Sequence, residues 1–533
     1  MRKLYLLLIS VVLLFALAGG SCKSYRNKHH SKHPGSFLWG AVNHKSHMPF
    51  DSNQVVKFYR SYPALIKYKE DLRDVYRLHK FTQIWYDEHG VVEFGQTLYN
   101  KVRELNDEGI SSKFPYRQKI DEVFGNGKVS ILTQTETDLM LTNLYLFYAE
   151  NVFKGIDDTA SMALGWLLPR KQVSYEALLD SVMVDPKLLN RNGSALFNQY
   201  YKLRDVLKRY RDIEKKGGWI PIDLDPKLKA YKPGDSAKAI LQIRERLFIT
   251  GELKQNNKSN KYDPELLEAV KKYQKNNGFN AGKSINSKHI QEMNIPVAER
   301  IKKIIVNMER CRWISPEISN AKTYIVVNIP AYTLDLVRDG KNELESPVIV
   351  GTNEKKTIIF SGMLSYIVFS PYWVIPPSVM EEEVKPGLAK NKNYLIQHNM
   401  EWYKGQLRQK PGKNNSLGLV KFIFPNADDI YMHDTPAKSL FAHEIRSFSH
   451  GCIRVGKPRD LAIDILKDDP VWTPKKIDAA MHAGKESTYI LKKKIPVYIG
   501  YLTAWVDEQG EINFYKDVYE LDGRLAELLL DGK

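Results

Sequence analysis

The sequence predicts a multidomain α+β protein in which a helical domain precedes a small helical module and a mostly β domain. Between residues 55 and 216, apolar side chains recur every three or four residues, the period of a helix that buries one face. From Tyr324 the period changes to two, in segments rich in Val, Ile, Tyr and Phe that Gly and Pro interrupt. At 533 residues the chain is too long for one hydrophobic core, so two to four domains are expected.

The first 21 residues have the pattern of a secretion signal. Two basic residues precede the apolar run Leu4–Leu17, and small residues and Cys22 follow it. A basic head, an apolar run of roughly 7–15 residues and a small-residue site are typical of exported proteins, whereas a membrane span needs about 20 apolar residues. Cys22 resembles the cysteine at which bacterial lipoproteins are lipidated, which predicts a membrane anchor. Cleavage near Ala18 or Gly20 without lipidation is the alternative.

The formal charge of +17 suits an acidic partner, such as nucleic acid, an acidic surface or an acidic polymer. Because an exported protein is separated from DNA and RNA, we expect no nucleic-acid partner. Residues 22–52 are rich in Lys, His, Ser and Asn without apolar periodicity, and we interpret them as a disordered tether. Their five histidines lack the ordered spacing of metal ligands.

Two helical regions follow the tether. Residues 53–223 are predicted to form a helical scaffold domain, which ends at the Gly- and Pro-containing segment GGWIPID. Residues 224–297 predict a module of three short helices, with Asp235 or Ser236, then Asp263, then Ser287 as N-caps. A small structural domain is the plain alternative for this module. A linking helix is expected within residues 298–322.

Residues 323–505 are predicted to form the mostly β domain, with one helix at Pro458–Lys467. Within it, residues 381–418 lose the β pattern in favour of polar sequence with Gly and Pro, which indicates an insertion without strands that caps a site. Residues 506–533 form a tail, which we expect to contain a strand pair and a short helix that pack on the scaffold.

The stretch YMHDTPAKSLFAHEIRSFSHGCIRV, from Tyr431 to Val455, contains the residues that can carry chemistry. The thiol of Cys452 is mostly protonated at neutral pH, so a catalytic role requires a base or a positive neighbour. His450 lies two residues earlier, which places it on the same face if the segment is a strand. His433 lies 19 residues upstream, far enough to return on a neighbouring strand. The residues alone leave the choice of base open.

Other side chains of this region suit peptide binding. Gly451 lets the backbone approach a substrate, so that nearby N–H groups can bind an oxyanion. Arg454 shares a strand face with Cys452 and offers a planar fork for a carboxylate. Trp373 and Tyr431 can line a peptide cleft, or pack on a strand face instead.

Two alternatives concern the cysteines. His433, His450 and Cys452 are all of metal-ligand type, but no fourth ligand follows at a usual spacing, so we expect neither metal nor cofactor. Cys311 lies among apolar and basic residues at helical spacing and is expected to be a packing residue. A Cys311–Cys452 disulfide is left open by the sequence and would consume the thiol of Cys452.

The histidine, the spacer and the Ser-His-Gly-Cys run resemble the catalytic motif of the YkuD-type L,D-transpeptidases. The segments VNIPAYTLDLV, VGT, FSPYWVIPPS, LGLVKFIFPN, YMHDTPAKSLF and SHGCIRV also occur in the order found in the larger, YcbB-type members. Those members have a helical scaffold, a peptidoglycan-binding module and a capping insertion. The three-helix module here resembles the peptidoglycan-binding domain through its VxxYQxxNGF pattern.

The resemblance implies that Cys452 is the nucleophile, that His433 is the base and that the backbone carbonyl of Asp434 orients it. It implies that Ser449, His450, Gly451 and Arg454 frame the donor peptide and the oxyanion. The implied reaction takes a tetrapeptide stem of peptidoglycan, releases D-Ala and forms a 3–3 cross-link in the cell envelope. The alternatives are an L,D-carboxypeptidase, in which water resolves the thioester, and a wall-anchoring lipoprotein whose catalytic domain is inactive.

Overall fold

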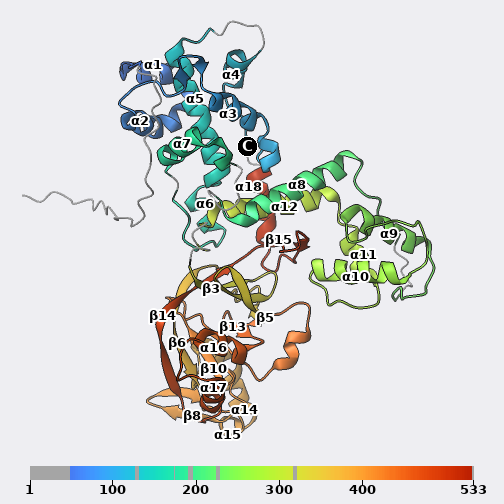
Figure 1. Ribbon diagram of the computed structural model, residues 1–533. Coiled ribbons are helices and arrows are strands. Elements are labelled where there is room, and N and C mark those ends of the chain that lie inside the picture. Colours follow the sequence, from blue (N-terminus) through green and yellow to red (C-terminus); the bar gives the residue numbers. More distant parts are fainter. Residues whose placement is uncertain are drawn as a thin grey trace, which may run out of the picture. The chain divides into compact units, whose positions relative to one another are not determined.

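The computed structural model describes residues 48–125, 131–172, 174–189, 196–223, 229–315, 318 and 321–530 (Figure 1). The predicted signal peptide, Cys22 and most of the predicted tether lie outside these residues. In the part of the chain that the structure describes, no helix combines the length and the apolar character needed to cross a membrane.

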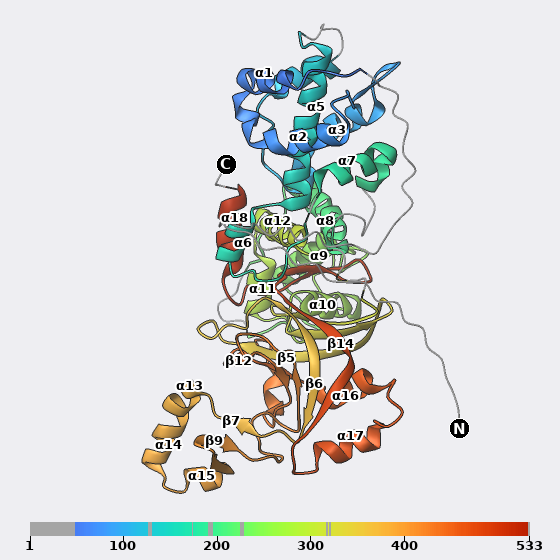
Figure 2. The same ribbon diagram turned by 90° about the vertical axis from the view of Figure 1, so that its left-hand side faces the viewer.

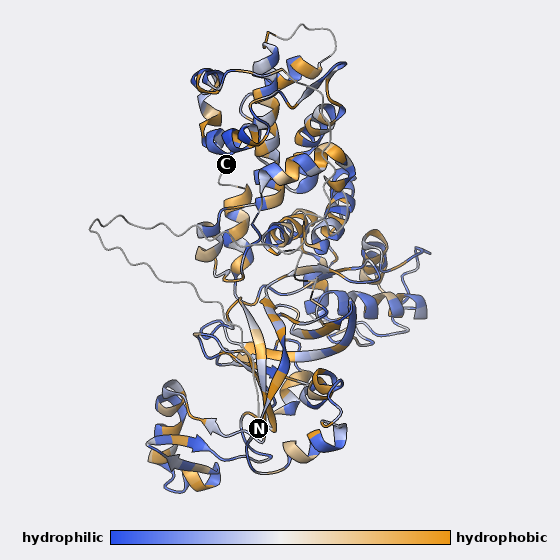
Figure 3. Ribbon diagram, turned by 60° about the vertical axis from the view of Figure 1, so that its left-hand side comes forward, coloured by the Kyte–Doolittle hydropathy of each residue, from blue (hydrophilic) through white to orange (hydrophobic). Residues whose placement is uncertain are grey.

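The helical domain is built around α5 (Gln134–Ala149), which is buried on every side from Thr137 onward. A capping box starts this helix, since Thr133 accepts a hydrogen bond from the N–H of Glu136 at 3.2 Å and Glu136 accepts one from the N–H of Thr133 at 2.9 Å. Most of the helices carry both apolar and polar residues (Figure 3), as expected for helices that bury one face. The other helices are α1 (Asn53–Ser61), α2 (Lys69–Leu78), α3 (Glu93–Arg103), α4 (Arg117–Phe124), α6 (Asp158–Ala163), α7 (Tyr175–Val184) and α8 (Asn198–Lys215), with a hairpin of β1 (Tyr86–Asp87) and β2 (Gly90–Val91).

The three-helix module consists of α9 (Lys238–Thr250), α10 (Pro264–Asn276) and α11 (Ser287–Met293), and it has an apolar core of its own. The predicted N-cap of α10 is confirmed, because a carboxylate oxygen of Asp263 accepts from the N–H of Leu266 at 2.9 Å. The other two capping predictions were wrong. Ser236 instead forms a β-bridge with Lys261, so that α9 begins after Ala237. Asn286 rather than Ser287 caps α11.

Helix α12 (Val297–Trp313), predicted as a linking helix, is buried along most of its length and packs against α8. Its Glu309 carboxylate lies 2.7 Å from the guanidinium of Arg312 and accepts from the N–H of Ile156 at 2.7 Å. The same guanidinium donates to the carbonyl oxygen of Glu108 at 2.7 Å. These buried charges satisfy one another, so α12 is a core element that joins the helical domain to the β domain.

The β domain is a nine-stranded sheet with the order β12-β5-β13-β11-β10-β6-β14-β3-β4, and its mostly β character is confirmed. Because β4 also pairs with β5, the strands from β5 to β4 form a closed ring. Strand β12 pairs with β5 and lies outside that ring. The strands are β3 (Thr323–Asn328), β4 (Thr333–Arg338), β5 (Lys341–Gly351), β6 (Ser361–Phe369), β10 (Val420–Ile423), β11 (Met432–His433), β12 (Ser447–Ser449), β13 (Ile453–Val455) and β14 (Ser487–Gly500), with helices α16 (Pro458–Leu466) and α17 (Pro474–Met481).

The insertion contains strands, so the prediction of a segment without them was wrong. Strands β8 (Met400–Tyr403) and β9 (Gln406–Gln409) form a hairpin, and β9 also pairs with β7 (Trp373–Val374). Strands of four residues are too short to display an alternating pattern, and the turn is formed by Lys404 and Gly405, both with positive φ. Figure 2 shows these strands with α13 (Pro377–Val379), which precedes the insertion, and with the insertion's helices α14 (Lys385–Lys390) and α15 (Tyr394–Gln397). The π-helical turn Met380–Val384 connects α13 to α14.

The C-terminal tail consists of the hairpin β15 (Ala504–Val506) and β16 (Ile512–Phe514) and of helix α18 (Leu521–Leu530). The side chain of Gln199 on α8 makes two hydrogen bonds with the backbone of Val506, at 2.7 and 3.0 Å. The Ser111 hydroxyl of the helical domain donates to the carbonyl oxygen of Leu529 at 3.2 Å. Helix α18 also contacts α12 (Figure 1), so the tail packs against the scaffold.

Candidate active site

Two short strands bring the ends of the Tyr431–Val455 stretch together. Strand β11 lies between β10 and β13 and pairs with β13 in parallel, so that Met432 faces Ile453 and His433 faces Arg454. The N–H of Ile453 donates to the carbonyl oxygen of Tyr431 at 3.1 Å. Cys452 directly precedes β13, and it therefore lies in the backbone neighbourhood of the strand that carries His433.

The imidazole of His433 is buried and held by main chain. Its Nδ1 atom lies 2.5 Å from the carbonyl oxygen of Asp434, so the neutral ring donates from Nδ1 and keeps Nε2 as an acceptor. Burial, followed by the positive charge of Arg454, lowers the pKa of His433 to about 3. At neutral pH the ring is uncharged, which is the state that a general base requires.

The carboxylate of Asp434 has a separate structural task. It accepts a hydrogen bond from the N–H of Leu419 at 2.9 Å and forms an ion pair with Lys438 at 2.5 Å. The side chain is therefore engaged by the neighbouring loop, while the backbone carbonyl faces His433. Lys421 on β10 is the register partner of His433 and adds to the positive charge around the ring.

The thiol of Cys452 is half-buried, and its Sγ atom lies 3.7 Å from the carbonyl oxygen of Asp429. Burial raises the pKa of Cys452, although hydrogen bonds from the backbone and side chain of Tyr431 oppose this effect. Cys311 is free and fully buried on α12, so the disulfide that the sequence left open is not formed. Cys452 is thus a free thiol that is protonated at rest.

The raised pKa of Cys452 predicts that its thiol reacts slowly with iodoacetamide at neutral pH and faster at alkaline pH. Because the pKa of Cys452 is raised, its thiolate fraction at neutral pH lies below that of an ordinary cysteine, whose pKa is about 8.5. The rate at Cys452, followed by mass spectrometry as a function of pH, should reach half its maximum above that value. A half-maximum in the neutral range would instead indicate a thiolate–imidazolium pair at rest.

The residues between β12 and β13 form a bend rather than a strand, so the inference that His450 shares a strand face with Cys452 was wrong. Gly451 has a φ of +113°, which few other residues tolerate. The Ser449 hydroxyl donates to the carbonyl oxygen of Cys452 at 2.6 Å and accepts from the N–H of Gly451 at 3.2 Å. The Ser449 hydroxyl therefore stabilises this loop, and the N–H of Gly451 is already hydrogen-bonded to it.

His450 points toward the insertion. Its Nε2 atom lies 3.8 Å from a carboxylate oxygen of Glu382 and 3.8 Å from one of Glu383. Glu382 also forms an ion pair with Lys355 at 2.5 Å. The beginning of the insertion thus borders the loop Ser449–Cys452, and His450, which is exposed, contacts this acidic pair.

Arg454 on β13 is half-buried, and burial lowers the pKa of its guanidinium. Its Nε atom has no hydrogen-bond partner among the described residues. Both Cys452 and Glu383 lie close enough to interact with its charge. A buried donor without a partner, in a group that remains charged, is available to bind an anionic or carbonyl oxygen of a substrate.

The aromatic pair is adjacent to the thiol. The ring of Tyr431 lies 5.7 Å from that of His433 in an edge-on arrangement, and its side chain interacts with Cys452 and Trp373. Burial raises the pKa of Tyr431, so its hydroxyl remains protonated. Trp373 on β7 belongs to the sheet of the insertion, which connects the insertion to the thiol through Tyr431.

Sequence reasoning missed three contributors. Asp429 has a φ of +51°, and only the Asp-Asp turn before the strand hints at its role. The acidic pair Glu382 and Glu383 is visible only as part of a charged run. Thr357 donates to the carbonyl oxygen of Gly451 at 2.7 Å, and nothing in its own segment indicates this contact.

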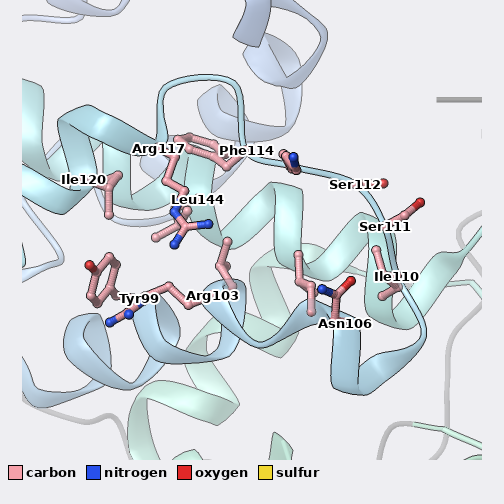
Figure 4. A pocket seen from close by; sticks show the side chains of 13 residues that line it. Tyr99, Arg103, Asn106, Ile110, Ser111, Ser112, Phe114, Arg117, Ile120 and Leu144 are labelled. Atoms are coloured by element: carbon pink, nitrogen blue, oxygen red, sulfur yellow. The ribbon is translucent and has the colours of Figure 1, made fainter. Parts of the chain in front are cut away.

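A pocket lies elsewhere, in the helical domain between α3 and α4 (Figure 4). It is lined by the cations Arg103, Lys113 and Arg117 and by apolar side chains such as Ile110 and Phe114. It includes no residue of the Tyr431–Val455 stretch. Within the described ranges, no group of three or more His, Cys, Asp or Glu side chains is arranged to hold a metal ion.

Comparison with known proteins found matches to parts of both large regions. Residues 322–472 match the family model of the L,D-transpeptidase catalytic domain, and residues 70–207 match a model described as a scaffold domain. A protein of Haemophilus influenzae named "Putative L,D-transpeptidase" is 34% identical over 252 residues, which cover 43% of this chain and 50% of that protein. The chain therefore spans about half the length of this relative.

Solved structures match at lower identity. An L,D-transpeptidase from Mycobacterium smegmatis is 16% identical, with a TM-score of 0.20, over 34% of this chain and 59% of that one. An L,D-transpeptidase from Stackebrandtia nassauensis is also 16% identical, with a TM-score of 0.20, over 52% of this chain and 95% of that one.

Proposed function

We propose, from the premise that residues 322–472 form a catalytic domain of the YkuD-type L,D-transpeptidase family, that this chain is a cysteine acyltransferase which forms 3–3 cross-links in peptidoglycan. The observation that carries the proposal is the parallel pairing of β11, which carries His433, with β13, which Cys452 directly precedes, together with the orientation of the imidazole by the carbonyl of Asp434. Nucleophilic catalysis requires a neutral, oriented base that can reach a free thiol, and the paired strands place His433 and Cys452 in the same neighbourhood.

The first half-reaction would form a thioester. His433 accepts the thiol proton at Nε2 while the sulfur attacks the carbonyl carbon of the L-centre of meso-diaminopimelate in a tetrapeptide stem. The tetrahedral intermediate then collapses, the bond to D-Ala breaks, and His433 returns the proton to the leaving amine. Because burial disfavours both the thiolate and the imidazolium at rest, proton transfer is expected to accompany attack on the bound substrate.

The second half-reaction would resolve the thioester. An amine of a second stem attacks the acyl carbon, His433 takes its proton, and the sulfur leaves as a thiol to restore the enzyme. Water in place of the amine would give the L,D-carboxypeptidase reaction. The neighbouring Trp373 and Tyr431 suit the walls of a peptide cleft, and the insertion, whose strand β9 pairs with the strand of Trp373, suits a cap over it.

Arg454 is proposed to bind a stem-peptide carboxylate, which its unpartnered Nε supports. Arg454→Lys keeps the charge but loses the planar two-donor fork, so kcat/KM should fall by roughly tenfold. Steady-state kinetics on a tetrapeptide donor measure this change. Arg459→Lys is the matched control, because Arg459 pairs with Asp478 at the surface. Equal kinetics for Arg454→Lys and the wild type would refute the role of Arg454.

The remaining parts of the chain are proposed to deliver the catalytic domain to the wall. Cys22 would carry a lipid anchor, residues 22–52 would form the tether, and the three-helix module would bind peptidoglycan. Support for the module comes from Asn280, whose side chain donates to the carbonyl oxygen of Ala442 and whose N–H donates to Glu444. Both acceptors lie between His433 and Cys452, so the module contacts the spacer of the catalytic motif.

The decisive experiment incubates the purified protein with disaccharide-tetrapeptides and identifies the products by mass spectrometry. We expect free D-Ala together with cross-linked dimers. Tripeptide monomers without dimers would identify a carboxypeptidase. Binding to isolated cell walls without any product would instead favour an anchoring protein with an inactive catalytic domain.

A further inference from the structure

We propose that Tyr519, in the C-terminal tail, is a positioning residue that holds the loop Ser449–Cys452, here called the nucleophile loop, in its active geometry. The proposal concerns the active site described above and rests on the proposed function. Tyr519 lies 67 positions after Cys452 in the sequence, outside the matched catalytic domain, and is buried. It never needs to touch a substrate, because it acts through Thr357.

Two hydroxyl groups in series connect the tail to the nucleophile loop. The Tyr519 hydroxyl donates to the carbonyl oxygen of Gly351 at 2.9 Å and accepts from the N–H of Thr357 at 3.0 Å. The Thr357 hydroxyl accepts from the N–H of Gly351 at 2.9 Å and donates to the carbonyl oxygen of Gly451 at 2.7 Å. Gly451 directly precedes the nucleophile, so the chain of contacts ends one residue from Cys452.

The loop needs an external support of this kind. At a φ of +113°, Gly451 adopts a conformation that glycine can leave readily, since it has no side chain to restrict it. The Ser449 hydroxyl braces the N–H of Gly451 and the carbonyl of Cys452 from within the loop. The contact from Thr357 orients the peptide plane between Gly451 and Cys452 from outside. Turning that plane would move the thiol relative to His433.

Tyr519 is itself fixed by the tail and the scaffold. Its ring stacks on Tyr501 with centroids 5.6 Å apart, and its N–H donates to the Tyr501 hydroxyl at 2.8 Å. The Tyr501 hydroxyl in turn donates to Asp517 at 2.5 Å. Asp522, in the first turn of α18, forms an ion pair with Arg310 of α12 at 2.6 Å. The loop geometry is therefore tied to the helix that runs through the scaffold core.

Tyr519→Phe tests the proposal, because it removes the hydroxyl and keeps the stacked ring. Thr357 and Gly351 each lose a buried partner, so the loop should relax. We expect kcat on a tetrapeptide donor to fall about tenfold with KM nearly unchanged. We also expect iodoacetamide to modify Cys452 at least about threefold faster at neutral pH, because a released loop exposes the thiol. Thr357→Val should reproduce both effects, and Thr357→Ser, which keeps the hydroxyl, should not.

Two controls separate positioning from a general loss of stability. Cys311, fully buried in α12, reports global unfolding in the same experiment, and its modification rate should stay constant. Tyr145→Phe removes an equally buried hydroxyl, which donates to the carbonyl of Tyr175 at 2.8 Å in the helical domain, and should leave kcat and Cys452 modification unchanged.

The proposal is overturned if Tyr519→Phe leaves both readouts unchanged, or if Cys311 becomes reactive in parallel with Cys452. The modification assay needs no peptidoglycan. If the wild type fails to act on tetrapeptides while the modification pattern holds, the proposed function fails and the support of the loop by Tyr519 stands.

Discussion

Replacement of Cys452 by Ala is expected to abolish turnover of tetrapeptide donors, with a loss of roughly 10⁴-fold or more in kcat. The thiol is half-buried and contacts only a few groups, among them the Asp429 carbonyl at 3.7 Å and the Tyr431 side chain, so its removal should change the fold little. Release of D-Ala, followed by mass spectrometry, measures the loss. In the wild type, the peptide that contains Cys452 should gain the mass of the acyl group when the acceptor amine is withheld.

Cys311→Ala is the matched control for this substitution. Cys311 is the other cysteine among the described residues, and burial raises its pKa to about 12, so it is chemically inert. The variant should lose some stability because the thiol packs in the core, but its kcat should match that of the wild type. Full activity of Cys452→Ala would overturn the thioester mechanism altogether.

Replacement of His433 by Asn is expected to lower kcat by roughly 10²–10⁴-fold, the range for loss of a general base. Asn can still donate a hydrogen bond toward the Asp434 carbonyl, as Nδ1 does now, but it has no acceptor where Nε2 lies. The variant therefore separates proton transfer from the structural role of the ring. Its folding can be compared with the wild type by thermal unfolding.

His450→Asn serves as the comparison, because His450 is the other base that the residues alone allow. It is exposed and faces Glu382 and Glu383 at 3.8 Å, so we expect an effect of less than about tenfold, as for a surface ion pair. If His450→Asn proves as damaging as His433→Asn, the assignment of the base has to be reversed.

Much of the site could be predicted because it lies within 25 consecutive residues. Spacing alone indicated that His433 could return beside Cys452, and the paired strands β11 and β13 provide that path. The orientation of side chains could not be predicted so well. The alternation argument for His450 assumed a strand, and the positive φ of Gly451 replaces that strand by a bend. The use of the Ser449 hydroxyl within the loop follows from the same bend.

The fold shows a similar division. Periods of three to four and of two residues identified the helical domain and the β domain, because each period reports one buried face over many residues. The hairpin β8–β9 was missed, since four-residue strands around Lys404 and Gly405 carry too little pattern. Contacts made across more than a hundred residues, such as those of Gln199 with Val506, leave no trace in either segment.

The hydrogen bond between Ser111 and Leu529 has a consequence for folding during synthesis of the chain. These residues are 418 positions apart, so the ribosome, which adds about 5–20 residues per second, makes the second on the order of 20–80 seconds after the first. During that interval the helical domain lacks α18 and the tail hairpin that cover it. The apolar residues of the helical domain that α18 and the hairpin cover therefore stay uncovered until the tail has been made.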